Sequence, residues 1–455
     1  MADRAQPPDR MLSLASAPLR RYSAAELRDV ERYFSPSAIL LTDRPNRTAK
    51  DRVRETVSAP VIDATEAAVT ELDRTTVVTA PDLDAARSLL GRPYDRPVAV
   101  VTSFIEQEID PNTFETTLSG LAEYQSLVRD REDIRTHFTT TLPAGQRLRQ
   151  SEVPLFGAGF IESLEGSRIP CINVGQRPIV EELDSSKVGI QAIPDIGRSM
   201  RRQLERQGCT DRQDILEMEP TDLLALDGFG PYYAARVTAG AHAIERARPL
   251  RFVQDPLAGD RRIYVDIETD SLTPQYIWQI GVYDEASEEY HAFVNDDEPG
   301  NEAAVVTDFA EWVASNAIDG TFIAWYGKRF DFVHLTDFID RHAPREHAKA
   351  WEAAEKFDLL LDFVKPGVAT PARSYKLDVV ADRLGYEREY PGLSGGGAAQ
   401  AYATWRAGGE MDWEKWISYC KDDVMATQYV YDTIAEAELF VDKRELERAY
   451  NRSTR

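Results

Sequence analysis

The sequence predicts a multidomain α/β protein, on three observations along its 455 residues. Apolar runs alternate with helix-compatible segments over residues 1–185, and a helical repeat follows over 186–250. Residues 258–440 return to alternating strands and helices, which here carry acidic residues at regular places. At roughly 150 residues per domain, this length suits about three domains. The charged end of the chain, 441–455, is expected to form a frayed helix or tail.

The composition is strongly acidic, with 53 Lys plus Arg against 77 Asp plus Glu and a formal net charge of −24. Lys50 and Lys187 are the only lysines in the first half. An acidic, lysine-poor chain is typical of a protein from a salt-rich cytoplasm, so we expect a halophilic, cytoplasmic protein. No stretch approaches the roughly 20 apolar residues that a membrane helix needs, so we expect no membrane segment. The negative net charge alone argues against a nucleic-acid partner, so the case for such a partner depends on the sequence motifs described below.

Residues 1–185 are expected to form a small α/β domain. Short apolar runs predict buried strands at 38–41, 76–79 and 98–102, and polar segments predict helices at 82–90 and about 113–136. No phosphate loop or catalytic set is present, so we assign this region no chemistry. A docking or substrate-positioning role is the expectation.

The helical repeat over 186–250 is clearest in its second copy, around Gly228-Phe229-Gly230-Pro231. The two glycines permit a tight turn around a buried Phe229, and Pro231 suits the first turn of a helix. Such a turn leaves backbone N–H groups unpaired at a helix start, which suits a phosphate.

A degenerate copy stands about thirty residues earlier, where Asp195 replaces the first glycine and Gly197 keeps the second. The pair resembles tandem helix-hairpin-helix modules that bind DNA backbone without reading sequence. A role in packing or protein contact alone is the alternative. The resemblance implies backbone contacts from the turns and from nearby arginines: Gly197, Arg198, Arg201, Arg202, Gly228, Phe229, Gly230 and Arg236. Residues 249–260 are expected to be a linker.

The segment from 262 to 270 predicts a buried strand that ends in acids. Asp266 and Glu268 are two residues apart, so they project from the same face of a strand. Two adjacent carboxylates at the end of a buried strand are unfavourable unless a cation compensates them, so this pattern predicts a metal site. Runs at 277–283 and 289–294 predict a hairpin that continues from this strand.

Two helices are expected to complete the acidic set. A helix at about 303–316 and a strand at 321–325 precede a glycine turn, after which Asp331 opens a helix over 331–341. A last helix begins at 413, and on it Tyr419 and Asp423 share a face because they are four apart. Asp422 points about a quarter turn away and is expected to be a solvated acid.

These motifs, in this order, resemble the tyrosine branch of the DEDD 3′→5′ exonucleases, with an RNase H-like mixed sheet flanked by helices. The resemblance implies two divalent cations, Mg²⁺ or Mn²⁺, held by Asp266, Glu268, Asp331 and Asp423. It implies that Asp266 bridges both cations and that Tyr419 orients the attacking water. Lys376 and Arg373 could hold the phosphate backbone.

The sequence thus predicts a metal-dependent nuclease, a 3′→5′ exonuclease that hydrolyses DNA by a two-metal mechanism, with DNA favoured over RNA because of the hairpins. Two alternatives stay open. One is an exoribonuclease that trims RNA, and the other is a non-catalytic nucleic-acid-binding scaffold with an RNase H-like fold.

Overall fold

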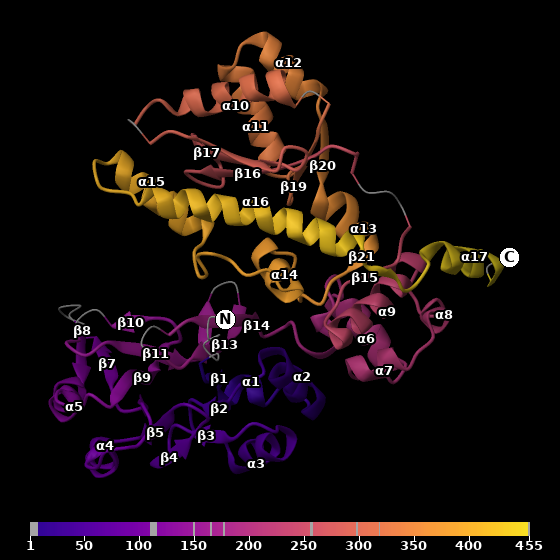
Figure 1. Cartoon of the computed structure of the whole chain (residues 1–455). Helices are drawn as coiled ribbons and strands as arrows, with labels where there is room; N and C mark the ends of the chain where they lie inside the picture. Colours follow the sequence, from indigo (N-terminus) through magenta and orange to yellow (C-terminus); the bar gives the residue numbers. More distant parts are fainter. Residues whose placement is uncertain are drawn as a thin grey trace. The chain divides into compact units, whose positions relative to one another are not determined.

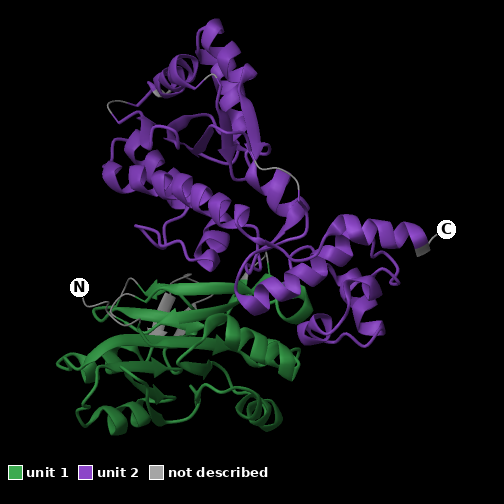
Figure 2. Cartoon of the chain, turned by 45° about the vertical axis from the view of Figure 1, so that its right-hand side comes forward, with its two compact units in different colours: residues 1–192 green, residues 193–455 purple. Residues whose placement is uncertain are grey.

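The computed structural model describes residues 8–109, 116–148, 151–163, 166–175, 178–254, 258–296, 299–317 and 319–453. The chain divides into two compact units, Met1–Ala192 and Ile193–Arg455 (Figure 2). The architecture is mixed α/β throughout (Figure 1). Apart from residues 186–192, which fall in the first unit, the predicted helical repeat and the acidic segment both lie in the second unit.

Two six-stranded sheets form the first unit, and both mix parallel and antiparallel strands. The first has the order β12-β13-β1-β2-β3, with β14 paired to β13. Its strands are β1 Arg10–Leu14, β2 Ala38–Leu41, β3 Val61–Asp63, β12 Ile161–Ser163, β13 Gly166–Asn173 and β14 Val180–Asp184. The second has the order β10-β11-β9-β6-β5-β4. Its strands are β4 Ala68–Glu71, β5 Thr76–Ala80, β6 Val98–Thr102, β9 Ile134–Pro143, β10 Arg147–Leu148 and β11 Leu155–Gly159.

The two sheets stack face to face, with helices on both outer faces. An inner apolar layer joins Met11 and Leu40 of the first sheet to Val77, Val101 and Phe138 of the second. On the outer face of the first sheet pack α1 Ser16–Leu19, α2 Ala24–Phe34 and α3 Arg47–Thr56. On the outer face of the second pack α4 Leu83–Leu90 and α5 Leu121–Val128. Because both faces of each sheet are covered, the strands are continuous apolar runs rather than alternating ones.

The strands predicted at 38–41, 76–79 and 98–102 are confirmed as β2, β5 and β6, and the helix predicted at 82–90 is α4. The long helix predicted at 113–136 is wrong. Residues 113–115 lie outside the described residues, and the rest divides into β8 Thr116–Ser119, α5 and the start of β9. β8 pairs with β7 Glu106–Ile109, and Gly120 at φ +76° breaks the chain direction before α5 begins.

The second unit begins with three short helices and one longer helix. They are α6 Arg198–Arg206, α7 Arg212–Leu216, α8 Pro220–Leu223 and α9 Pro231–Arg246. The predicted linker at 249–260 includes a short strand, β15 Leu250–Arg251, which pairs with β21 Val368–Ala369 and β22 Glu438–Leu439. Residues 255–257 of that stretch lie outside the described residues. The three-stranded sheet therefore ties the chain before the acidic segment to the chain after it.

A five-stranded mixed sheet is the centre of the second unit, with the order β18-β17-β16-β19-β20. Its strands are β16 Arg262–Thr269, β17 Ile277–Asp284, β18 Glu289–Val294, β19 Thr321–Ala324 and β20 Glu355–Asp358. β16, β17 and β18 form an antiparallel meander, as predicted, and β19 and β20 run parallel to β16.

Helices cover both faces of this sheet (Figure 1). One face packs against α10 Glu302–Asn316, α11 Asp331–His342 and α12 Arg345–Ala353. The other packs against the π-helix η2 Leu359–Val364, α14 Leu377–Leu384 and α16 Trp413–Ala435. α13 Lys365–Gly367 extends η2, α15 Gly395–Arg406 precedes α16, and α17 Lys443–Ser453 lies in the charged stretch at the end of the chain. Among the described residues, no helix is both long and apolar enough to cross a membrane.

Candidate active site

The first acidic pair lies on the central strand of the sheet. Val265 and Ile267 of β16 point into the core beneath α10 and α11, while Tyr264 packs on the opposite side with α16. Strand alternation therefore turns Asp266 and Glu268 toward α16. Asp266 is half-buried and Glu268 is only 5% exposed.

Gly281 on the neighbouring strand lets α16 approach this face. It stands opposite Asp266 in the β16–β17 register. A Cβ atom at this position would lie 2.7 Å from the Tyr290 hydroxyl and 2.8 Å from the Cys420 sulfur. The missing side chain thus leaves room for Cys420, which brings the Tyr419–Asp423 part of α16 onto the strand.

Cys420 contacts Asp266 directly. Its Sγ lies 3.6 Å from Asp266 Oδ2, and ligand atoms of Asp266, Glu268 and Cys420 lie within 4.8 Å of one another. Burial and the nearby carboxylates raise the pKa of the Cys420 thiol well above its usual value. The thiol therefore stays protonated and acts as a weak donor to Asp266, while the carboxylates remain the hard ligands of the group.

Asp331 reaches the same place from the other face of the sheet. It is the first residue of α11 and is 4% exposed, and its carboxylate accepts hydrogen bonds from its own main chain and from that of Ile267. The preceding turn has its positive φ at Tyr326 (+66°), one residue before the predicted glycine. Gly327 is required for space instead, since a Cβ there would lie 2.7 Å from the Phe332 ring.

The structure therefore gathers Asp266, Glu268, Asp331 and Asp423, the carboxylate cluster, from three separate elements. Burial raises the pKa of Asp266 and Glu268 well above their usual values, and the other acids of the cluster raise it further. Burial also raises the pKa of Asp331 to about 7. Burial is the largest cause of all three shifts, and repulsion between neighbouring carboxylates adds to it.

Arg388 supplies one positive charge to the cluster, and it was missed from the sequence. Its Nη2 lies 2.5 Å from Asp423 Oδ1, with both side chains 15% exposed. Burial raises the pKa of Asp423, while this guanidinium and the Tyr419 hydroxyl, which is hydrogen-bonded to Asp423, act to lower it.

The loop that carries Arg388 is held by Asp422. The Asp422 carboxylate accepts hydrogen bonds from the main-chain nitrogens of Glu389 (2.9 Å) and Tyr390 (3.3 Å) and from the Tyr386 hydroxyl (3.2 Å). The expectation that Asp422 is a solvated acid is therefore wrong, because it is 7% exposed and fully engaged by this loop. Neighbouring acids on α16 thus serve different partners, with Asp423 in the cluster and Asp422 behind it.

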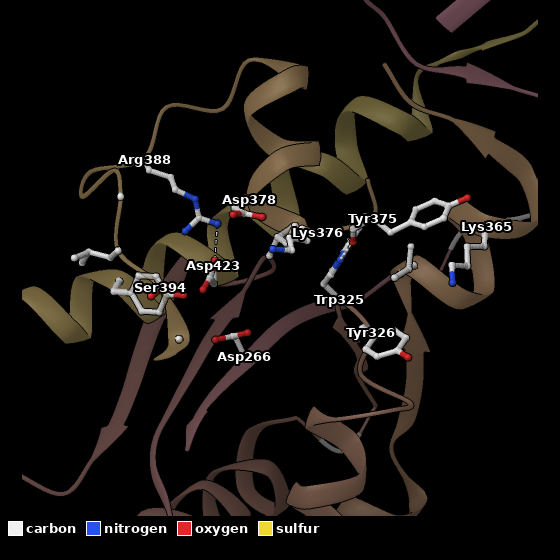
Figure 3. Close-up of a pocket in the computed structure, with 16 residues that line it drawn as sticks. Asp266, Trp325, Tyr326, Lys365, Tyr375, Lys376, Asp378, Arg388, Ser394 and Asp423 are labelled. Carbon is white, nitrogen blue, oxygen red and sulfur yellow. Dashed lines mark hydrogen bonds and ion pairs between the residues drawn. The ribbon is translucent and has the colours of Figure 1, made fainter. Parts of the chain in front are cut away.

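A cavity of about 710 Å³ opens over the cluster (Figure 3). Asp266, Asp423 and Tyr419 line it, whereas Glu268 and Asp331 lie beneath and do not. Three basic residues and three more aromatic residues share the lining, namely Lys365, Lys376, Arg388, Trp325, Tyr326 and Tyr375. The predicted Lys376 is therefore at the cavity, but Arg373 is 3% exposed and is not part of its wall.

The predicted hairpin residues lie apart from this cavity. Gly197, Arg198, Arg202 and Gly228 are exposed, Gly230 is half-buried, and Phe229 is buried as expected. Arg201 is half-buried and its guanidinium pairs with Glu205 at 2.7 Å. Cβ atoms added at Gly197, Gly228 or Gly230 would meet nothing within 4 Å, so the turns present open backbone.

Arg236 departs from its expected place. It is 2% exposed, and its guanidinium donates to the carbonyls of Val364 (3.4 Å), Lys365 (3.2 Å) and Val368 (2.9 Å). An arginine that already serves buried carbonyls is not available to a phosphate at the surface. The amphipathic pattern of α9 could not reveal this, because the acceptors are about 130 residues further along the chain.

Comparisons with known proteins support the fold of this segment. No curated protein matches the chain. Among the solved structures that match, one crystal structure matches over 39% of this chain and its own full length, at 8% identity and a TM-score of 0.27, and so distant a likeness supports no conclusion. Residues 263–435 match the family model described as the RNase_H superfamily. The part of the chain that contains the whole carboxylate cluster and Tyr419 is therefore similar to the RNase_H superfamily.

Proposed function

We propose that this protein is a metal-dependent nuclease that hydrolyses phosphodiester bonds at the carboxylate cluster. One observation carries the proposal: four carboxylates from three elements converge at a cavity, two of them in its lining and two buried, and the same lining includes three basic and several aromatic residues. The acids suit divalent cations, and the basic and aromatic residues suit a nucleic-acid strand. The match to the RNase_H superfamily, whose members are commonly nucleases, supports the same class.

The donor set fits hard divalent cations. All four proposed ligands are carboxylates, which suit Mg²⁺ or Mn²⁺ better than Zn²⁺. The pKa values of Asp266 and Glu268 are raised, as expected for carboxylates without a nearby positive charge. Arg388 forms an ion pair with Asp423 and not with the other three acids, so a bound cation would supply the missing charge. We propose that Asp266, Glu268, Asp331 and Asp423 would hold two such cations, with Asp266 serving both, Glu268 and Asp423 serving one and Asp331 the other, as the resemblance implies.

Bound cations would neutralise charge on the phosphodiester and activate water as the nucleophile. The protein's own groups would orient the reactants. The Tyr419 hydroxyl, fixed by its hydrogen bond to Asp423, would align the water opposite the leaving oxygen. The water oxygen would form a bond to phosphorus as the bond to the leaving oxygen breaks. The proton lost by the water would pass to solvent, and the leaving oxygen would take a proton from solvent.

Two cavity residues would hold the substrate's phosphates. Lys376 is exposed at the cavity, and Arg388 stands beside Asp423 at the same opening. Both could neutralise phosphate charge that the cations do not reach, which reduces repulsion between an acidic protein and an acidic substrate. The exposed turns at Gly197 and at Gly228–Gly230 would add contacts to backbone further along the strand.

We propose DNA as the substrate and 3′→5′ as the polarity, from the resemblance of the motifs and of the hairpins. The test is digestion of single-stranded DNA, duplex DNA and RNA, each labelled at the 3′ or the 5′ end, in high KCl with Mg²⁺, Mn²⁺ or EDTA. Metal-dependent release of the 3′ label from DNA supports the proposal. Preferential loss of RNA makes the protein an exoribonuclease, and binding without cleavage makes it a scaffold.

A further inference from the structure

The two hairpin turns have the same backbone but different chemistry. Asp195 (φ +70°) and Gly228 (φ +81°) occupy matching left-handed positions, and each is followed by a buried apolar residue, Ile196 or Phe229. A glycine then caps the next helix with nearly the same dihedrals in both copies. Aspartate adopts positive φ less readily than glycine, so its presence at this position calls for a compensating contact.

Asp195 has such a contact in the nuclease segment. Its Oδ2 accepts a hydrogen bond from the Tyr375 hydroxyl at 2.5 Å and lies 3.3 Å from Arg236 Nε. Gly228, at the matching position, has open space around it. The carboxylate of the first turn therefore contacts Tyr375 and Arg236, next to residues 364–377, whereas the backbone of the second turn is open to solvent.

Arg236 closes the same junction from the second copy of the repeat. Besides its three carbonyl partners, its guanidinium donates to the Tyr375 hydroxyl and lies over the Tyr375 ring at 5.4 Å. Tyr232 on the same helix donates to the Lys365 carbonyl at 2.8 Å. Side chains from both copies thus converge on Tyr375 and on the main chain that ends η2.

Tyr375 is part of the wall of the candidate active site. Its carbonyl accepts a hydrogen bond from Trp325 Nε1 at 2.9 Å, and Lys365 Nζ lies 4.9 Å from its ring centre. Figure 3 shows these three residues on the side of the cavity away from Arg388 and Ser394. Lys376 follows directly in the chain, so the position of Tyr375 also sets the position of a proposed phosphate contact.

We infer that Asp195 is a positioning residue: through Tyr375, and together with Arg236, it fixes the aromatic and basic wall of the cavity against which a nucleic-acid strand binds. The first hairpin is then a docking hairpin and only the second is a phosphate-contacting one. The nucleic-acid substrate in this inference rests on the proposed function, but the contacts among Asp195, Tyr375 and Arg236 do not depend on any activity.

The experiment compares three single variants of the full chain, and the double variant of the first two, with the wild type. Asp195→Gly restores the glycine of the repeat and relieves the backbone, while it removes the carboxylate. Tyr375→Phe removes only the hydroxyl and keeps the ring. We expect it to fold normally, so it still tests the junction if Asp195→Gly does not fold. Gly228→Asp is the matched control, because it places the same side chain in the same conformation at the turn that faces solvent.

Two readouts are taken: KM and kcat on short single-stranded DNA, and amide hydrogen exchange of residues 364–377 without substrate. Asp195→Gly and Tyr375→Phe should each raise KM by roughly tenfold, as the loss of one hydrogen bond to a charged group implies, with a much smaller change in kcat. Both should speed exchange in 364–377, and the double variant should be no worse than either. Gly228→Asp should leave exchange in 364–377 unchanged.

The opposite pattern overturns the inference. If Asp195→Gly tightens substrate binding and leaves exchange in 364–377 unchanged, the first turn is a phosphate loop that Asp195 obstructs. If the wild type cleaves no nucleic acid, the proposed function fails, and exchange in Asp195→Gly and Tyr375→Phe still decides whether the junction holds the cavity wall.

Discussion

Replacement of Asp331 by Asn should stabilise the metal-free protein at high pH while it damages the site. The folded pKa of Asp331, about 7, lies above its ordinary value of 3.8, so the folded protein binds this proton more tightly than the unfolded chain. The stabilisation from the proton is complete below about pH 4 and is lost as the pH rises through about 7. Asn carries no charge at any pH and escapes that loss.

The size of the effect follows from the same two values. Their difference, at about 1.4 kcal/mol for each pH unit, corresponds to at most about 4 kcal/mol in the free energy of unfolding above pH 7. The asparagine amide oxygen can still accept one of the main-chain hydrogen bonds that Asp331 now receives, so little is lost in return. At pH 4 the two proteins should be equally stable.

Urea unfolding at pH 4, 6 and 8, in EDTA and in Mn²⁺, measures this directly. Mn²⁺ at pH 8 should stabilise the wild type and stabilise Asp331→Asn far less. Asp340→Asn, an exposed position on the same helix, is the control and should follow the wild type. If the free energy of unfolding of Asp331→Asn is lower than that of the wild type by the same amount at every pH, the ionised Asp331 carboxylate does not destabilise the metal-free protein, and the reasoning is refuted.

Four further outcomes are expected. Tyr419→Phe should lower kcat by roughly 10²–10³ with little change in the Mn²⁺ concentration required, as titration of the cleavage rate will show; full activity would mean that Tyr419 only packs. Arg388→Gln should raise KM and, because Asp423 loses its partner, tighten Mn²⁺ binding in calorimetry; unchanged values for both would remove Arg388 from the site. Gly281→Ala should cut kcat while far-UV circular dichroism stays normal, because its Cβ would push α16 away from β16. Gly230→Val should weaken binding of long DNA with kcat on short substrates unchanged, because its Cβ would cover open backbone, and equal affinity would make the turn a packing element.

Much of the nuclease segment could be predicted because its signals are local. Alternation along β16 places Asp266 and Glu268 on one face, and a spacing of four does the same for Tyr419 and Asp423 on α16. The strands and helices predicted over residues 262–341 agree with the structure to within a few residues, and the helix predicted to begin at 413 begins there as α16. In the first unit, the strands that are buried on both faces could also be predicted, because they are continuous apolar runs.

The missed residues depend on contacts between distant parts of the chain. Arg388 lies in a charged stretch that looks like a solvated loop, and only the hydrogen bonds to Asp422 fold it onto Asp423. Helix periodicity correctly separated Asp422 from Asp423 but could not say that a loop covers the first. The same limit explains Arg236, whose partners come from a turn of the chain about 130 residues away.

The most direct test of the central claim is the rate at which end-labelled single-stranded DNA is degraded as Mn²⁺ is titrated, for the wild type, Asp266→Asn and the Asp340→Asn control. We expect saturable, EDTA-sensitive degradation by the wild type and the control, and none by folded Asp266→Asn, because that position serves both proposed cations. Cleavage by Asp266→Asn at the wild-type rate, or cleavage that EDTA does not stop, would contradict this expectation.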